Sequence, residues 1–174
     1  EVDWKSRIER VLMGDFADAS EEERTRAIED VIQACSVAAG AVTIQPIPIV
    51  DTALITPIQI GMVQAIGKVR GYSLDPKSVV EILSVFGASI VTQNIIIAAS
   101  KLVPFAGWAI SISMAYSLTY AIGVASNRYF ESGRGAPRKD LETLFKETFE
   151  EKKREKQEVA TPRVKDRLTQ LTEA

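Results

Sequence analysis

The chain has 174 residues and a formal net charge of −2, with 46% hydrophobic and 25% charged residues. This length suits one domain with short appendages, and the near-neutral charge excludes the strongly basic footprint of a nucleic-acid-binding protein. Histidine is absent and Cys35 is the single cysteine, so the commonest metal ligand and an internal disulfide are both excluded. We therefore expect no metal centre and no bound cofactor.

The first predicted element is a short amphipathic helix in an N-terminal segment, residues 1–19. Its apolar side chains recur at helical spacing between charged ones, at Trp4, Ile8, Val11 and Leu12. Such a helix either folds back on the core or docks on a membrane surface or a partner, and the pattern leaves both open. No signal peptide opens the chain, which begins at Glu1 rather than methionine and so fits a fragment of a longer protein.

A second helix is predicted to begin at a capping box formed by Ser20 and Glu23. From residue 31 to residue 42 the sequence is small and apolar on every side, as in a buried helix. Cys35 lies in this run, so we expect a buried thiol. Prolines at 46 and 48 should end the helix, because proline lacks the N–H that a helix needs.

The third helix is predicted to start at Asp51 or Thr52, because either side chain can accept backbone hydrogen bonds as an N-cap. It should run to about Arg70 and end at Gly71, since glycine readily adopts the left-handed conformation. Pro57 then falls inside the helix, where it either produces a kink or moves the true start to a later residue.

Asp75, an N-cap acid followed by proline, predicts a helix over 76–102, and a further helix is predicted over 105–129. These segments contain two runs without a formal charge, 82–100 and 102–127. Each run has about the 20 residues that a membrane-spanning helix needs, and the pair could equally be the buried centre of a soluble bundle. A bundle whose apolar hairpin inserts reversibly would combine the two.

Polar residues give evidence both for and against a membrane-spanning hairpin. Thr92, Gln93 and Asn94 lie near the middle of the first run, and amides buried in hydrocarbon are costly unless they are paired. Basic residues outside both ends of the two runs favour a hairpin whose ends are both cytoplasmic. The basic residues are Lys68, Arg70 and Lys77 before the runs, and Arg128, Arg134, Arg138 and Lys139 after them.

Residues 134–174 are predicted to form a charged helical tail. One helix is expected over 140–158, with an apolar side made of Leu141, Leu144, Phe145, Thr148 and Phe149. Its later part, 150–158, is almost wholly charged and should be solvated. Pro162 is expected to interrupt it before a short amphipathic turn.

An internal repeat is predicted, because a shift of 56 residues places the third helix on the helix over 105–129. The two copies cover about 28–72 and 82–129, and the paired positions include Pro48 with Pro104 and Gly67 with Gly123. The predicted fold is all-α. It is a helical bundle of two tandem helix–Pro bend–helix hairpins over 20–133, followed by a charged C-terminal helix.

No catalytic constellation is visible, and the phosphate-loop, nucleophile-elbow and paired-cysteine motifs are all absent. We therefore expect that the protein is not an enzyme. Asp51 is the most interesting acid, and its N-cap role competes with a contact to another helix or to a partner. Gln59 and Gln64 are expected to hydrogen-bond between helices.

Three stretches carry a resemblance to a known family. They are residues 46–72, with Pro48-x-x-Asp51, Gln59-x-x-Met62 and Gly67; residues 101–107, Lys-Leu-Val-Pro-Phe-Ala-Gly; and Thr119-Tyr-Ala-Ile-Gly123 followed by Tyr129-Phe130. Over roughly residues 28–133 the chain resembles the YcjF-type bacterial domain of unknown function. The resemblance does not extend to 1–19 or 138–174.

The resemblance implies a membrane-associated module at the cytoplasmic face of the inner membrane, coupled to a small GTPase that is fused to it or encoded beside it. The family has no established catalytic residues. The matching positions are therefore expected to be structural or partner-facing: Pro48, Asp51, Gln59, Met62, Gly67, Pro104, Gly107 and Gly123.

Three basic residues, Lys68, Arg70 and Arg128, are the expected contacts to lipid phosphates. The alternative is a soluble, cytoplasmic protein-interaction domain whose apolar hairpin is fully buried. Whether the chain forms a homo-oligomer is left open.

Overall fold

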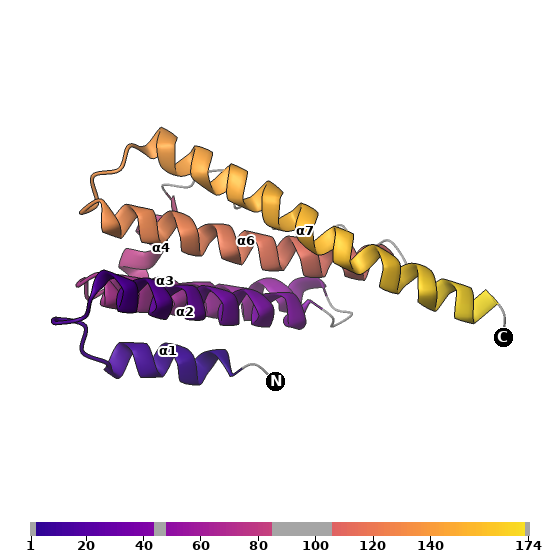
Figure 1. The fold of residues 1–174 in the computed structure, drawn as a ribbon, viewed down its shortest axis with the longest axis horizontal. Coiled ribbons are helices and arrows are strands. Elements are labelled where there is room, and N and C mark those ends of the chain that lie inside the picture. Colours follow the sequence, from indigo (N-terminus) through magenta and orange to yellow (C-terminus); the bar gives the residue numbers. More distant parts are fainter. Residues whose placement is uncertain (1–2, 44–47, 85–105, 173–174) are drawn as a thin grey trace.

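The computed structural model describes residues 3–43, 48–84 and 106–172. In these ranges the fold is an all-α bundle, as predicted. The helices are α1 (Trp4–Met13), α2 (Glu21–Val42), α3 (Pro48–Val69), α4 (Pro76–Ser84), α6 (Ala106–Glu131) and α7 (Arg138–Thr172). The long helices lie along one common direction, and α7 extends past the rest of the bundle at its C-terminal end (Figure 1).

Helix α1 folds back on the bundle, where it packs against α2 and α3. Its apolar stripe points inward, because Ile8 and Val11 are both buried. An ion pair between Arg7 and Asp30 ties its outer edge to α2. Of the two alternatives left open by the amphipathic pattern, the structure has the folded-back helix.

Helix α2 begins at the predicted capping box. The Ser20 N–H donates to Glu23 Oε2 at 2.7 Å, and the Glu23 N–H donates to Ser20 Oγ at 3.2 Å. Its second half lies in the core, and Cys35 is fully buried there as a free thiol. Burial raises the pKa of this thiol to about 12, because a thiolate would be poorly solvated in apolar surroundings.

Helix α3 starts at Pro48, so the prediction that Asp51 or Thr52 caps it is wrong. Proline is well suited to the first helical position, since its fixed φ is helical and its missing N–H would have no partner there. Asp51 therefore lies inside the first turn rather than ahead of it. Pro57 lies within the helix, so it does not move the helix start to a later residue.

The end of α3 is the predicted glycine stop. Gly71 has a φ of +89°, in the left-handed region. The Tyr72 N–H donates to the Gly67 carbonyl at 2.8 Å, and the Gly71 N–H donates to the Lys68 carbonyl at 3.1 Å. This pair of bonds is a Schellman motif, which satisfies two carbonyls that the helix end would otherwise leave open.

The predicted start of α4 is confirmed, because Asp75 Oδ1 accepts a hydrogen bond from the Ser78 N–H at 2.7 Å. The rest of the predicted helix, from residue 85 to residue 102, and Pro104 lie outside the described residues. The helix predicted over 105–129 is α6. Gly133, with a φ of +63°, follows its end.

Helix α6 is the centre of the bundle, since it packs against α2, α3 and α7. The bundle middle, which we define by Cys35 on α2, Met62 on α3 and Leu118 on α6, is fully buried. Five serine and threonine side chains of α6 are buried as well: Ser111, Ser113, Ser117, Thr119 and Ser126. In the described ranges, no helix combines enough length with enough hydropathy to cross a bilayer. Of the two charge-free runs, 82–100 lies mostly outside the described residues.

Helix α7 runs without a break from Arg138 to Thr172, so the expected interruption at Pro162 is wrong. The residues around it are mostly good helix formers, and they carry the helix past the one proline. The expectation of a fully solvated stretch over 150–158 is also wrong in part. Lys152 and Lys156 are half-buried, with their ammonium groups 4.9 Å and 4.2 Å from the ring centres of Tyr120 and Tyr116.

Candidate interaction surface at one end of the bundle

Four of the eight residues predicted to be structural or partner-facing lie inside the bundle: Gln59, Met62, Gly67 and Gly123. Gln59 of α3 is buried, and its Nε2 donates to Thr119 Oγ1 of α6 at 3.2 Å. Met62 is fully buried in the bundle middle. Gly123 lets α2 approach α6, because a Cβ atom there would lie 2.6 Å from Ile32 Cγ1.

Gly67 has a different neighbour, since a Cβ atom at this position would lie 2.6 Å from Leu74 Cδ1. Pro48 and Gly107 lie in the first turns of α3 and α6. Pro104 lies outside the described residues, as does the side chain of Asp51. The structure thus does not bring the predicted set together at one site.

The three basic residues predicted to meet lipid phosphates have different surroundings. The Arg70 side chain is only 8% exposed, and it bridges three helices by donating to Asn127 Oδ1 at 2.9 Å and to Glu21 Oε1 at 2.6 Å. Arg128 is exposed and donates to Glu131 Oε2 at 3.3 Å. Arg70 is therefore used within the bundle, and a lipid phosphate would have to displace Glu21 to reach it.

Arg24 and Arg70 both lie at one end of the bundle, which we call the loop pole. We define the loop pole as residues 14–20, 70–75 and 132–137 with the helix ends beside them. The connections between α1 and α2 and between α6 and α7 lie at this end (Figure 1). It also includes the C-terminal end of α3, which Arg24 contacts and which Arg70 directly follows.

Arg24 of α2 holds the loop pole together through backbone carbonyls. Its Nη2 donates to the Phe16 carbonyl at 2.6 Å, and its Nε donates to the Ala19 carbonyl at 3.1 Å. Its Nη1 donates to the Val69 carbonyl of α3 at 2.9 Å. One guanidinium thus fixes the α1–α2 loop and caps the C-terminal end of α3, where a cation is also favoured by the helix dipole.

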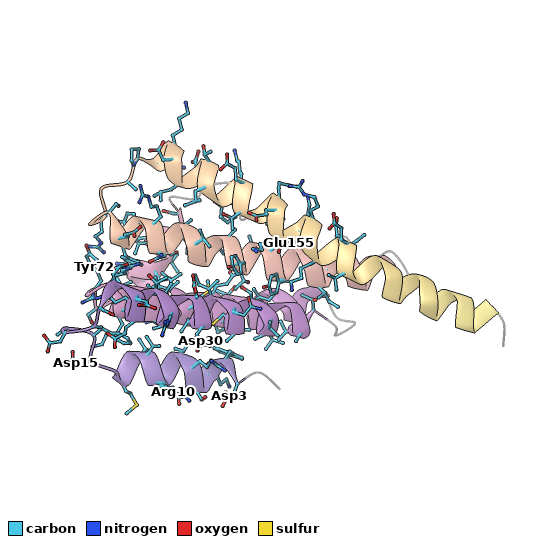
Figure 2. All side chains as sticks on the ribbon, in the orientation of Figure 1. Asp3, Arg10, Asp15, Asp30, Tyr72 and Glu155 are labelled. Carbon is cyan, nitrogen blue, oxygen red and sulfur yellow. The ribbon has the colours of Figure 1, made fainter. Side chains whose placement is uncertain are left out.

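A shallow cavity of about 260 Å³ opens beside this clamp. It is lined by Asp15, Phe16, Ala17, Arg24, Lys68, Val69, Gly71, Tyr72 and Ser73. Asp15 and Tyr72 lie at the same end of the molecule in Figure 2. The guanidinium of Arg134, from the α6–α7 loop, lies 5.1 Å from the ring centre of Tyr72.

Carboxylates at the loop pole are held in their ionised form. A hydrogen bond from Arg70 lowers the pKa of Glu21, and backbone and side-chain hydrogen bonds from Ser20 lower the pKa of Glu23. Hydrogen bonds from Ser78 lower the pKa of Asp75. Because these folded-state pKa values are depressed, their stabilising effect is present above the unfolded pKa and is lost as the pH falls through the folded value.

The arrangement supplies fixed charges, aromatic faces and a notch, which are the parts of a binding surface. In the described parts of the chain, no group of three or more Cys, Asp or Glu residues is placed to hold a metal ion. The cavity contains one carboxylate, that of Asp15, which accepts a hydrogen bond from the Ala17 N–H at 2.9 Å.

The comparison with protein families gives a match over residues 10–154 to the family described as Domain of unknown function (DUF697). The chain belongs to the DUF697 family. The DUF697 match is wider than the resemblance found by inspection, because it also includes the end of α1, the capping box of α2 and the part of α7 that packs on α6. Searches of curated proteins and of solved structures find no match.

Sequence reasoning missed Arg24, which is central to the loop pole of this DUF697 domain. Its partners are main-chain carbonyls, and one of them lies 45 residues away in the chain. A backbone acceptor leaves no mark on the amino-acid sequence. The only available signal was an arginine beside three glutamates, which suggests an ion pair rather than a carbonyl clamp.

Proposed function

We propose that this DUF697 domain is a non-enzymatic helical module that works with a small GTPase domain or protein at the cytoplasmic face of a membrane. The observation that carries the non-enzymatic part is the use made of polar side chains. Gln59, Arg24 and Arg70 all join one helix to another or to a loop. Groups with these structural duties are not free to take part in chemistry.

The GTPase partner is proposed from the resemblance to YcjF-type domains, which are found fused to or beside such enzymes. The test uses the purified chain and the small GTPase from the same protein or the neighbouring reading frame. Calorimetry should detect binding, with affinities that differ between the GDP-bound and GTP-analogue-bound partner. Equal affinity for both nucleotide states would remove the regulatory coupling, and no binding would remove the partner.

Membrane association is proposed for the charge-free run over 82–100. Flotation with vesicles containing anionic lipid should carry the chain upward, and Ile96→Glu should abolish this, because a charge within an inserted segment is costly. The control is Val80→Glu on α4, whose side chain is already 55% exposed. Loss of flotation in both variants, or in neither, would contradict insertion of this run.

A second candidate is a soluble interaction domain, and the buried hydroxyls of α6 favour it. Ser117 Oγ donates to the Ser113 carbonyl one turn earlier in α6 at 2.5 Å, and Thr119 Oγ1 accepts from Gln59 of α3. The contact between Gln59 and Thr119 joins two helices and suits an α6 that is surrounded by other helices. Under this candidate the chain is monodisperse without detergent and stays with the aqueous fraction in flotation, and a requirement for detergent would rule it out.

A further inference from the structure

The loop pole carries two charge clusters of opposite sign. The acidic half, residues 15–26, has five acids against two bases, a formal charge of −3. The basic half, residues 128–139, has four bases against one acid, a formal charge of +3. The acidic half begins in the α1–α2 loop and the basic half includes the α6–α7 loop, at the same end of the bundle (Figure 1).

The cavity at the loop pole is lined by the acidic half and by the end of α3. Asp15 of the acidic half lines it, and so does Tyr72, whose ring contacts Arg134 of the basic half. Lys68 also lines it and is half-buried, with no ion pair to a described residue. The surface therefore offers an acidic edge, a basic edge and a notch that contains a cation.

Each half also has exposed charges that no contact within the described chain neutralises. Asp18 of the acidic half and Lys139 of the basic half are exposed and take part in no ion pair among the described residues. Other charges in these halves are paired within the chain, as Arg26 is with Glu22. The unmatched charges are the ones that a partner can neutralise.

The partner must itself carry both signs. An anionic bilayer or a nucleic acid would be attracted by the basic half and repelled by the acidic half, so neither fits the whole surface. A second copy of this chain fits it without further assumption. A two-fold axis through the notch places the acidic half of each copy against the basic half of the other, and every contact is made twice.

We propose that the chain self-associates through the loop pole as a two-fold dimer. In this dimer Asp18 of each copy faces the basic half of the other, and the notch cation Lys68 meets an acidic side chain from the facing loop. The interface is polar and confined to the end of the bundle. It should therefore be weak and salt-dependent, because the Debye length falls from about 10 Å at 0.1 M salt to about 3 Å at 1 M.

The test measures the dimer dissociation constant of the whole chain by sedimentation equilibrium. Reversal of the acidic half in Asp18→Lys/Glu22→Lys, or of the basic half in Arg134→Glu/Lys139→Glu, should weaken the dimer by about tenfold or more. An equimolar mixture of these two variants should associate again, because each supplies the charges that the other repels. That rescue distinguishes pairing of the two halves from a loss of folding, which circular dichroism also checks.

Matched controls change the net charge equally but lie on other surfaces. Glu9→Lys/Glu147→Lys and Lys146→Glu/Arg154→Glu alter exposed residues of α1 and α7 and should leave the dissociation constant within about twofold. A chain that stays monomeric at about 100 µM in 0.1 M salt would overturn the proposal. So would a dimer that the pole variants leave unchanged, or binding of anionic vesicles by a monomer through the basic half.

Discussion

The bundle middle and the loop pole exclude water in different ways. In the middle, α2 and α6 approach closely at Gly40 and Gly123, and most of the buried side chains are apolar. At the loop pole, the guanidinium groups of Arg24 and Arg70 replace apolar packing with hydrogen bonds to carbonyls, an amide and a carboxylate. The middle should therefore respond to changes in volume, and the pole to the loss of donors.

Removal of the carbonyl clamp should have the largest effect. Arg24→Met keeps most of the side-chain volume but leaves the carbonyls of Phe16, Ala19 and Val69 without their donor, and we expect a loss of about 3 kcal/mol in the free energy of unfolding. Urea denaturation measures it. The control Arg26→Met removes an exposed ion pair with Glu22 and should cost about 0.5 kcal/mol or less. Similar costs for both would show that the clamp is not what holds the pole.

High pH should weaken the bundle middle through Cys35. The folded thiol has a pKa of about 12, whereas an unfolded cysteine has a pKa of about 8.5. Above pH 8.5 the unfolded chain loses a proton that the folded chain keeps, so stability falls as the pH rises toward 12. At pH 10 the expected loss is about 2 kcal/mol.

The Cys35→Ala variant separates the effect of the thiol on stability from that of lysine and tyrosine side chains, which also titrate at high pH. Between pH 8 and pH 10 the stability of the wild type should fall by about 2 kcal/mol more than that of the variant. A gap that stays constant across this range would mean that the thiol is not as well shielded as its full burial indicates.

The stability cost of an added methyl group should be larger at the tight α2–α6 contact than at looser helix contacts. In Gly123→Ala the new Cβ meets three atoms of Ile32, including Cγ1 at 2.6 Å, so the side chain cannot simply swing aside. Alanine has a higher helix propensity than glycine, which offsets part of this cost. We therefore expect a net loss of about 1–2 kcal/mol in the free energy of unfolding. In Gly61→Ala the new Cβ meets mainly the mobile tip of Ile8, Cδ1, at 2.9 Å, so the change should be close to neutral.

Whether Ile32 causes the Gly123→Ala penalty can be tested by making room for the new methyl group. In an Ile32→Ala background the added Cβ at Gly123 has space, and the same substitution should become neutral or favourable by up to about 1 kcal/mol. A Gly123→Ala penalty that is the same in both backgrounds would show that Ile32 is not its cause.

The success of prediction from sequence follows the same division between local and distant causes. The capping box at Ser20 and the helix start at Asp75 were predicted correctly, because each depends on a few neighbouring residues. The start of α3 was placed too late, since a proline at the first helical position was taken for a helix stop. The clamp of Arg24 was missed because its acceptors are backbone atoms of a loop and another helix.

The candidate interaction surface was even less accessible to sequence reasoning. Lys68, Asp15 and Tyr72 are far apart in the chain, and they meet only because the helix ends converge at one pole. The predicted internal repeat of 28–72 and 82–129 stays a prediction, because much of its second copy lies outside the described residues.

A polar contact inside the middle tests whether volume alone decides stability there. Thr119→Val preserves the shape but removes the acceptor of the Gln59 amide, and we expect a loss of about 1 kcal/mol. Adding Gln59→Leu removes the stranded donor, so the double variant should be more stable than the sum of the two single changes predicts. Strict additivity in this double-mutant cycle would show that the hydrogen bond contributes no coupling.

The smallest effect is expected where α7 lies on α6, a contact that belongs to neither region. Lys156 Nζ lies 4.2 Å from the ring centre of Tyr116, so Lys156→Met should cost about 0.5 kcal/mol by removing the charge while keeping most of the stem. Lys146→Met, at an exposed position of α7, is the control and should be neutral. Equal effects of the two substitutions on stability would mean that the ammonium charge over the ring does not contribute to it. A difference would show that Lys156 of α7 stabilises the bundle through a cation over an aromatic face. This differs both from the apolar packing of the bundle middle and from the hydrogen bonds of the loop pole.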